Sequence, residues 1–247
     1  MIVAIMIGRA GSRGYPGKNI KKVLGRRLCE YPLLAAAKSK YIDKIYIASD
    51  CNVINSYSKK YKTGLIKRPK KLNSSKALGE DVFKFSYEQL KLKENLEDRD
   101  IKYVVLLFAN AATITSFIID KGITMLNRNK KFDSAVTTSV YNMWSPLRAR
   151  KLDKKGNLKP FVEFEYFGNP KTLNCDRDSQ GDVHYADMSV SIVRPKCLTN
   201  MKNGLLPQKW MGKNIASIPS DGGCDVDYEW QLPMVEHWLK KKGIKKK

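Results

Sequence analysis

IVAIMIGRAGSRGYPGKN, residues 2–19, sets the class of fold expected for this chain. The run IVAIMI is apolar at every position, which is typical of a parallel strand buried on both faces of a sheet. The loop that follows is rich in glycine and in basic residues, a composition suited to holding an anion. The stretch therefore predicts an α/β protein and raises the question of which anion the loop holds.

Other strands and helices alternate along the rest of the chain. Apolar strand patterns are found at 45–49, 103–108, 133–140, 188–195 and 214–219. Helical patterns are found at 28–39, 52–61, 79–95, 115–127 and 227–243, with Thr115 a candidate N-cap. This alternation predicts a Rossmann-like, mostly parallel sheet with helices on both faces, within a single domain spanning 1–247.

The pattern changes at 141–186, where regular alternation gives way to irregular sequence. LDKKGNLKPF (152–161) is typical of a β-hairpin, with glycine and asparagine at its turn. We expect this segment to be an insertion that contributes to an acceptor site or to a dimer interface.

The 247 residues carry a formal net charge of +22. The excess is mostly lysine spread over the whole length, with a small cluster, KKKGIKKK, at 240–247. No RNA-binding aromatic motif, zinc-finger spacing or helix-turn-helix pattern accompanies it. We expect a solvated basic surface that attracts small polyanionic substrates, and nucleic acid is an unlikely partner.

Other features bear on location and redox chemistry. No apolar run reaches the ~18 residues that a membrane span needs, and the first residues lack a secretory signal pattern. We therefore expect a cytoplasmic protein. The five cysteines include no C-x-x-C pair, which argues against a disulfide framework or a zinc site; they are Cys29, Cys51, Cys175, Cys197 and Cys224.

The glycine loop fits neither of two familiar phosphate loops. Its spacing is G-x-x-G-x-x-G, whereas a dinucleotide fingerprint is G-x-G-x-x-G with an acid about 20 residues on, and Asp50 lies further away. A Walker loop has Ser or Thr after its lysine, where this chain has Asn19. Arg9, Arg13 and Lys18 indicate a denser anion, such as a triphosphate.

AIMIGRAGSRGYPGKNIKKVLG resembles the opening signature of the acylneuraminate cytidylyltransferases, the CMP-sialic acid synthetases. Their loop reads A-R-G-G-S-K-G-x-P-x-K-N, and Arg13 stands where lysine is usual. The resemblance implies a nucleotide-diphospho-sugar transferase fold and gives Arg9 and Lys18 catalytic roles on the CTP triphosphate. It also implies nucleotide binding by residues of the loop, namely Gly11, Ser12, Arg13, Gly14 and Asn19.

Later segments extend the resemblance over essentially the whole chain. RPKKL followed by EDV resembles a stretch near the base and ribose, which implies nucleotide contacts from Arg68 and Asp81. GCDVDYEWQLPMVEHWL resembles the family's terminal S-x-D-I-D segment. The resemblance places the catalytic magnesium ion on Asp225 and Asp227, a pair consistent with the one or two carboxylates that Mg²⁺ usually takes.

The acceptor half departs from the family. The usual L-L-Q-P-T-S-P-L-R becomes LLFANAATIT, and Y-x-x-N-G becomes YADMS at 185–189. The resemblance implies acceptor contacts from four residues, which are Phe108, Asn110, Arg177 and Tyr185. Sialic acid itself is therefore not assumed to be the acceptor.

Taken with the resemblance, these features indicate Mg²⁺-dependent transfer of CMP from CTP to an acidic sugar, a nonulosonate or related 3-deoxy-ulosonic acid. Release of pyrophosphate and a homodimer are also implied. One alternative is CTP-dependent activation of a phosphonate or other small acid. Another is a basic nucleic-acid-binding protein that keeps a nucleotidyltransferase-like fold.

Overall fold

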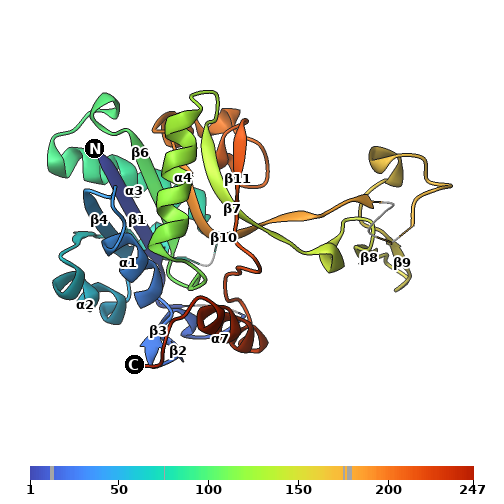
Figure 1. Cartoon of the computed structure of the whole chain (residues 1–247), viewed down its shortest axis with the longest axis horizontal. Helices are drawn as coiled ribbons and strands as arrows, with labels where there is room; N and C mark the ends of the chain where they lie inside the picture. Colours follow the sequence, from blue (N-terminus) through green and yellow to red (C-terminus); the bar gives the residue numbers. More distant parts are fainter. Residues whose placement is uncertain (12–13, 75, 175, 177–179) are drawn as a thin grey trace.

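A mostly parallel sheet forms the centre of the molecule (Figure 1). The computed structural model describes residues 1–11, 14–74, 76–174, 176 and 180–247. Within them the main sheet has seven strands in the order β11-β7-β10-β6-β1-β4-β5. These strands are β1 (Ile2–Gly8), β4 (Lys44–Ser49), β5 (Gly64–Ile66), β6 (Tyr103–Phe108), β7 (Ser134–Val140), β10 (His184–Val193) and β11 (Ile215–Pro219). β10 runs antiparallel to β6 and β7, and the other pairings are parallel, which confirms the predicted sheet.

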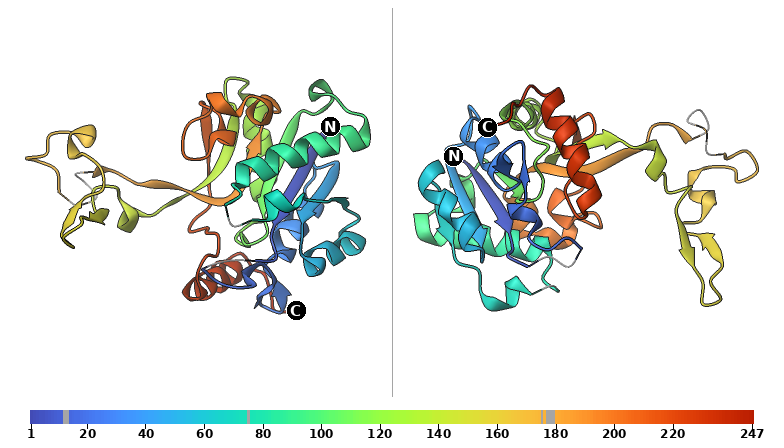
Figure 2. Two further views of the ribbon diagram at one scale, coloured as in Figure 1. Left: turned by 180° about the vertical axis from the view of Figure 1, so that it is seen from behind. Right: turned by 90° about the horizontal axis from the view of Figure 1, so that it is seen from below.

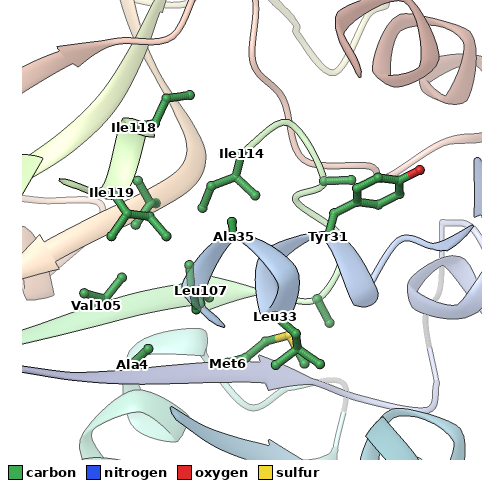
Figure 3. Close-up of a cluster of buried hydrophobic side chains, with 14 of the residues drawn as sticks. Ala4, Met6, Tyr31, Leu33, Ala35, Val105, Leu107, Ile114, Ile118 and Ile119 are labelled. Atoms are coloured by element: carbon green, nitrogen blue, oxygen red, sulfur yellow. The ribbon is translucent and has the colours of Figure 1, made fainter. Parts of the chain in front are cut away.

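Helices cover both faces of this sheet, as the alternation predicted (Figures 1 and 2). The α-helices among the described residues are α1 (Glu30–Ala37), α2 (Asn52–Tyr61), α3 (Gly79–Glu94), α4 (Ser116–Arg128), α6 (Lys196–Thr199) and α7 (Leu232–Lys241). Alternate residues of β1 divide the core: Met6 packs with α1 and α4 on one face, and Ile5 packs with α3 on the other. Figure 3 shows the first of these clusters.

Several predicted boundaries need correction. β10 begins at His184, four residues before the predicted start, because it continues its pairing with β7 as far as His184 opposite Val140. The segment outside the sheet is therefore 141–183. The last helix begins at Leu232 and not at 227, since a short 3-10 turn, Glu229–Gln231, precedes it. Thr115 is the N-cap of α4, with its side-chain oxygen accepting from the Ile118 amide at 3.4 Å, as predicted.

The described residues between 141 and 183 form an arm that extends away from the body (Figures 1 and 2). The predicted hairpin is present in it as β8 (Arg150–Leu152) and β9 (Leu158–Pro160). Every residue of these two strands is exposed. The arm also exposes large apolar side chains, including Phe161 and Tyr166, the latter 83% exposed.

The described cysteines are free thiols: Cys29, Cys51, Cys197 and Cys224. Burial raises the pKa of the Cys29 and Cys224 thiols to about 12, so they remain protonated near neutral pH. Among the described residues, no helix is both long and apolar enough to cross a bilayer.

A small antiparallel pair, β2 (Lys22–Val23) and β3 (Arg26–Arg27), follows the glycine loop and precedes α1. The backbone amide of Cys29 donates to the carbonyl of Asn19 at 3.0 Å, which ties the end of the loop to the start of α1. The loop is therefore anchored at both ends, by β1 before it and by α1 after it.

Candidate active site

The glycine loop begins at the carboxyl end of β1, beside the carboxyl ends of β4 and β6. In open α/β sheets this edge is where ligands bind. Gly8 is required for packing, because a Cβ there would lie 2.6 Å from the Cβ of Ala109. At Gly11 a Cβ would meet no atom of the described residues within 4 Å.

Side chains from several elements hold the loop backbone. The Asn19 side-chain amide is buried and donates to the Arg9 carbonyl at 2.8 Å. Asp50, which follows β4, accepts a bond from the Ala10 amide at 2.9 Å. Sequence reasoning used Asp50 only to reject a dinucleotide fingerprint and missed this role. Its signal was an acid directly after a strand whose carboxyl end lies at the same edge as the loop.

The Arg68 side chain forms hydrogen bonds to the backbone at the start of the loop. It is buried, and its guanidinium donates to the Gly8 carbonyl at 3.2 Å and to the Leu72 carbonyl. Burial lowers the pKa of Arg68 from its usual value. Arg9, on the loop itself, reaches the carbonyl of Ser74 at 3.3 Å. The two arginines therefore join the loop to the segment at 68–74.

The loop contacts the predicted acid pair directly, although the two lie at opposite ends of the sequence. The Lys18 ammonium pairs with the Asp227 carboxylate. A Cβ at Gly14 would lie 2.9 Å from the backbone oxygen of Asp227, so glycine is needed for the two segments to approach this closely. Lys18 is largely covered, while the side chain of Asp227 is 57% exposed.

The two acids sit in different environments. Asn110, just after β6, donates from its side-chain amide to Asp225 Oδ2 at 3.2 Å and to the Val226 carbonyl at 2.9 Å. The Val226 amide returns a bond to the Asn110 carbonyl at 3.1 Å. Burial and the neighbouring charge of Asp227 raise the pKa of Asp225, partly offset by Lys18 and Asn110.

This pair fits a magnesium ion. Two neighbouring carboxylates repel each other, and a cation bound between them offsets this repulsion. Mg²⁺ is commonly held by one or two carboxylates together with substrate phosphates. No group of three or more metal-ligating acids, histidines or cysteines occurs in the described ranges. A magnesium ion on this pair would need further oxygen ligands, which substrate phosphates and water can supply.

The predicted acceptor residues fall into separate groups. Phe108 packs edge-on against Phe83 with ring centroids 5.1 Å apart, and lies 6.1 Å from Trp210. Tyr185 lies at the base of the arm, 5.3 Å from the ring of Trp144. Asn110 contacts the acid pair. Arg177, the fourth predicted acceptor contact, lies outside the described residues.

Among the predicted nucleotide contacts, Asp81 lies exposed in the first turn of α3, and Ser12 and Arg13 lie outside the described residues.

Strand order, the glycine loop and the acid pair together define an α/β protein with a cationic loop and a carboxylate pair at the carboxyl edge of its sheet. A family model described as cytidylyltransferase matches residues 3–217, so the chain belongs to the cytidylyltransferase family. This confirms the family and the fold that the loop signature predicted.

Two curated relatives are acid-sugar enzymes by name. The chain is 28% identical over 152 residues to a Helicobacter pylori protein named pseudaminic acid cytidylyltransferase and UDP-2,4-diacetamido-2,4,6-trideoxy-beta-L-altropyranose hydrolase. It is 24% identical over 165 residues to N-acylneuraminate cytidylyltransferase of Escherichia coli. These matches cover 61% and 67% of this chain, but 28% and 37% of the relatives, so the chain spans well under half of their length.

Solved structures agree on the fold. CMP:2-keto-3-deoxy-manno-octonic acid synthetase complexed with CTP superposes with a TM-score of 0.66 at 12% identity, covering 98% of this chain and 99% of that chain. The 4-diphosphocytidyl-2C-methyl-D-erythritol synthase of Anaerococcus prevotii gives a TM-score of 0.58 at 13% identity, covering 97% and 96%. At these identities the likeness concerns the fold alone.

Proposed function

We propose that this chain transfers CMP from CTP to an acidic sugar, with Mg²⁺, and releases pyrophosphate. The observation that carries the proposal is the contact between Lys18 and Asp227, which joins the glycine loop to the acid pair at the carboxyl edge of the sheet. A cationic loop and a carboxylate pair at one edge are the two parts that a metal-assisted reaction on a triphosphate needs. Membership of the cytidylyltransferase family supports the choice of nucleotide.

The reaction is an in-line displacement at the α-phosphorus. The acceptor hydroxyl oxygen forms the new bond to phosphorus while the bond to the bridging oxygen breaks, pyrophosphate leaves, and the hydroxyl proton passes to solvent. Little covalent chemistry is asked of the protein, so positioning and positive charge dominate. Arg9, Lys18 and the loop amides supply that charge to the triphosphate.

Asp225 and Asp227 would hold the metal. Magnesium, when bound there, supplies positive charge that orients the triphosphate and lowers the pKa of a nearby hydroxyl. Asn110 keeps Asp225 in place through its amide. Lys18, which pairs with Asp227 in this structure, is in position to exchange that carboxylate for a phosphate oxygen when substrate binds.

Nucleotide contacts are proposed for the loop and for the segment behind it, at Gly11, Ser12, Arg13, Gly14, Asn19, Arg68 and Asp81. The surroundings of Gly11 support this, since no atom of the described residues lies within 4 Å of where a Cβ would be. The Asn19 amide nitrogen and the two terminal nitrogens of Arg68 donate to backbone carbonyls, so the main effect of these residues on the nucleotide is to shape the loop.

An acidic sugar is proposed as acceptor because the curated relatives are named for pseudaminic acid and N-acylneuraminate. Phe108, Asn110, Arg177 and Tyr185 are the proposed acceptor contacts. We also propose a homodimer in which the arm at 141–183 contributes to the interface or to the acceptor site. The proposed location is cytoplasmic. The exposed apolar side chains of the arm support a role in contacts with another chain.

Product identification tests the proposal. The protein is incubated with CTP, Mg²⁺ and a panel of nonulosonic, 3-deoxy-ulosonic and phosphonic acids, and products are identified by mass spectrometry. A CMP-linked acid sugar with equal release of pyrophosphate is expected. Activity with a phosphonate alone would shift the acceptor class to the first alternative, and no pyrophosphate release with any acid would contradict the proposal.

Thermal stabilisation separates the enzyme from the nucleic-acid alternative. A ligand that binds only the folded state raises its stability, so CTP with Mg²⁺ should raise the melting temperature more than ATP or GTP does. Stabilisation by duplex DNA and not by CTP would favour the nucleic-acid-binding reading.

A further inference from the structure

A buried polar cluster packs against the turn that precedes the acid pair in the sequence. The loop from Ser220 to Asp227 carries Asp225 and Asp227, and it leaves the end of β11 through two glycines. The backbone amides of Gly222 and Gly223 both donate to the side-chain oxygen of Ser139, at 3.0 and 2.9 Å. One hydroxyl of β7 thus holds the turn that precedes the acids.

The orientation of that hydroxyl is fixed by Asp187 of β10. Ser139 Oγ donates to Asp187 Oδ2 at 2.8 Å, and Asp187 Oδ1 accepts from the Ser189 amide at 3.1 Å. A serine hydroxyl has one hydrogen and two acceptor positions. Because its hydrogen is directed to Asp187, both acceptor positions remain for the two glycine amides.

Asp187 is 2% exposed, and its hydrogen-bond partners within the described ranges are a hydroxyl and a backbone amide. Burying a carboxylate without a paired cation is costly, so a buried acid of this kind calls for an explanation. The surroundings supply one, since the carboxylate orients a hydroxyl that in turn orders the acid loop.

Gly223 shows how closely the loop is held. A Cβ at Gly223 would lie 2.7 Å from Asp187 Oδ2 and 2.4 Å from Ser220 Oγ, so no larger residue fits. The next residue is held from another side: the Cys224 amide donates to Thr113 Oγ1 at 2.8 Å, and Thr113 Oγ1 donates to the Cys224 carbonyl at 3.0 Å. The backbone immediately before Asp225 is therefore fixed from β7, from β10 and from the segment after β6.

We propose that Asp187 and Ser139 are positioning residues that hold the turn at 222–223 so that Asp225 and Asp227 are preorganised for the metal. This inference rests on the proposed function. Partners that orient metal ligands through hydrogen bonds are worth about 10–100-fold in metal affinity or activity when removed. The Asp187→Asn variant keeps the shape of the side chain and changes its charge and its ability to accept the serine hydrogen.

The chain offers a matched control at the other end of β7. Asp133 is also buried, at 7% exposure, and its carboxylate accepts backbone amides from Lys213 and Asn214, both at 3.0 Å. It therefore holds a loop by direct hydrogen bonds and also pairs with Lys196, whereas Asp187 acts on its loop through Ser139. Asp133 lies just before the first residue of β7, away from the carboxyl edge. Asp133→Asn should destabilise the fold without affecting the metal site.

The test compares wild type, Asp187→Asn, Ser139→Ala and Asp133→Asn at a temperature well below all melting points. Mn²⁺ binding in the presence of CTP is followed by electron paramagnetic resonance, alongside melting temperature and steady-state kinetics. We expect Asp187→Asn and Ser139→Ala to weaken Mn²⁺ binding about tenfold and to raise the Mg²⁺ concentration for half-maximal rate similarly. The KM for CTP at saturating metal should change little.

Different outcomes separate the two claims. If wild type binds Mn²⁺ with CTP and the site variants match Asp133→Asn, losing only melting temperature, the positioning role is wrong while the proposed function stands. If wild type neither binds Mn²⁺ nor releases pyrophosphate, the proposed function fails, and the positioning role falls with it. Should Asp187→Asn fail to fold, Ser139→Ala carries the same comparison, since it removes a single oxygen.

Discussion

The carboxyl edge of the sheet and the arm at 141–183 differ in how their side chains are held. At the edge, polar side chains form hydrogen bonds to the backbone: the Asn19 amide donates to the Arg9 carbonyl and the Asn110 amide donates to the Val226 carbonyl. In the arm, β8 and β9 are exposed throughout and large apolar groups face outward. The described residues of the edge are held by hydrogen bonds within one chain, whereas the arm exposes apolar surface of the kind that a second chain covers.

The largest loss of catalysis is expected when the acid pair at the edge is replaced. Asp225→Asn together with Asp227→Asn should lower kcat by about 10³-fold or more, because a bound metal is worth several kcal/mol of transition-state stabilisation and each 1.4 kcal/mol is tenfold. The measurement is pyrophosphate release at saturating CTP, with the melting temperature as a check on folding.

Asp221→Asn is the matched control for that change. Asp221 lies in the same loop, and its exposed carboxylate pairs with Lys242 at 3.2 Å. Its φ of 54° is one that asparagine tolerates. Turnover should stay within a factor of about two, in line with the small worth of exposed ion pairs. Equal losses in the two loop variants would show that the acid pair has no special role.

Lys18 tests the link between the loop and the acids. Lys18→Met should lower kcat/KM about 10²-fold, since it removes the positive charge proposed to act on the reacting phosphates while keeping the length of the side chain. Lys22→Met, an exposed lysine of β2, should leave kcat/KM near the wild-type value. A Lys18→Met variant with wild-type kinetics would mean that Lys18 serves only to pair with Asp227.

A substitution in the arm should affect catalysis least when activity is measured at high protein concentration, and its main effect should be on self-association. Tyr166→Asp should weaken self-association at least tenfold in analytical ultracentrifugation, because an aromatic group buried at an interface is commonly worth about 2 kcal/mol. Phe117→Asp on α4 is the matched control, since Phe117 is 74% exposed on the body. A wild-type chain that sediments as a monomer at all concentrations would contradict the dimer.

Much of the fold followed from local pattern. The apolar runs at β1 and β6, the N-cap at Thr115 and the hairpin of the arm were predicted, because burial on both faces, capping and turn chemistry are local properties of a sequence. The start of β10 was misplaced. HYA (184–186) is not apolar enough to signal a strand, and only its pairing with β7 makes it one.

The sequence predicts some residues of the candidate site and not others, because only some of them belong to a local pattern. The loop and the acid pair have signatures within a few residues of sequence, so the sequence alone predicts which residues form them. Asp50, Ser139 and Asp187 were missed in their roles, because their partners lie in distant parts of the chain. Asp50 accepts from the Ala10 amide and Ser139 from the Gly222 and Gly223 amides, whereas Asp187 acts through the Ser139 hydroxyl.

The amino-acid sequence by itself determined the class of fold, the family and the cationic glycine loop, because each is written in contiguous residues. Only the tertiary structure decided that Lys18 lies against Asp227, that Asn110 holds Asp225 and that a buried aspartate stands behind the turn at 222–223. These contacts join residues from 48 to 209 positions apart. Such distances are set by strand order and register, and strand order and register depend on the packing of the whole sheet.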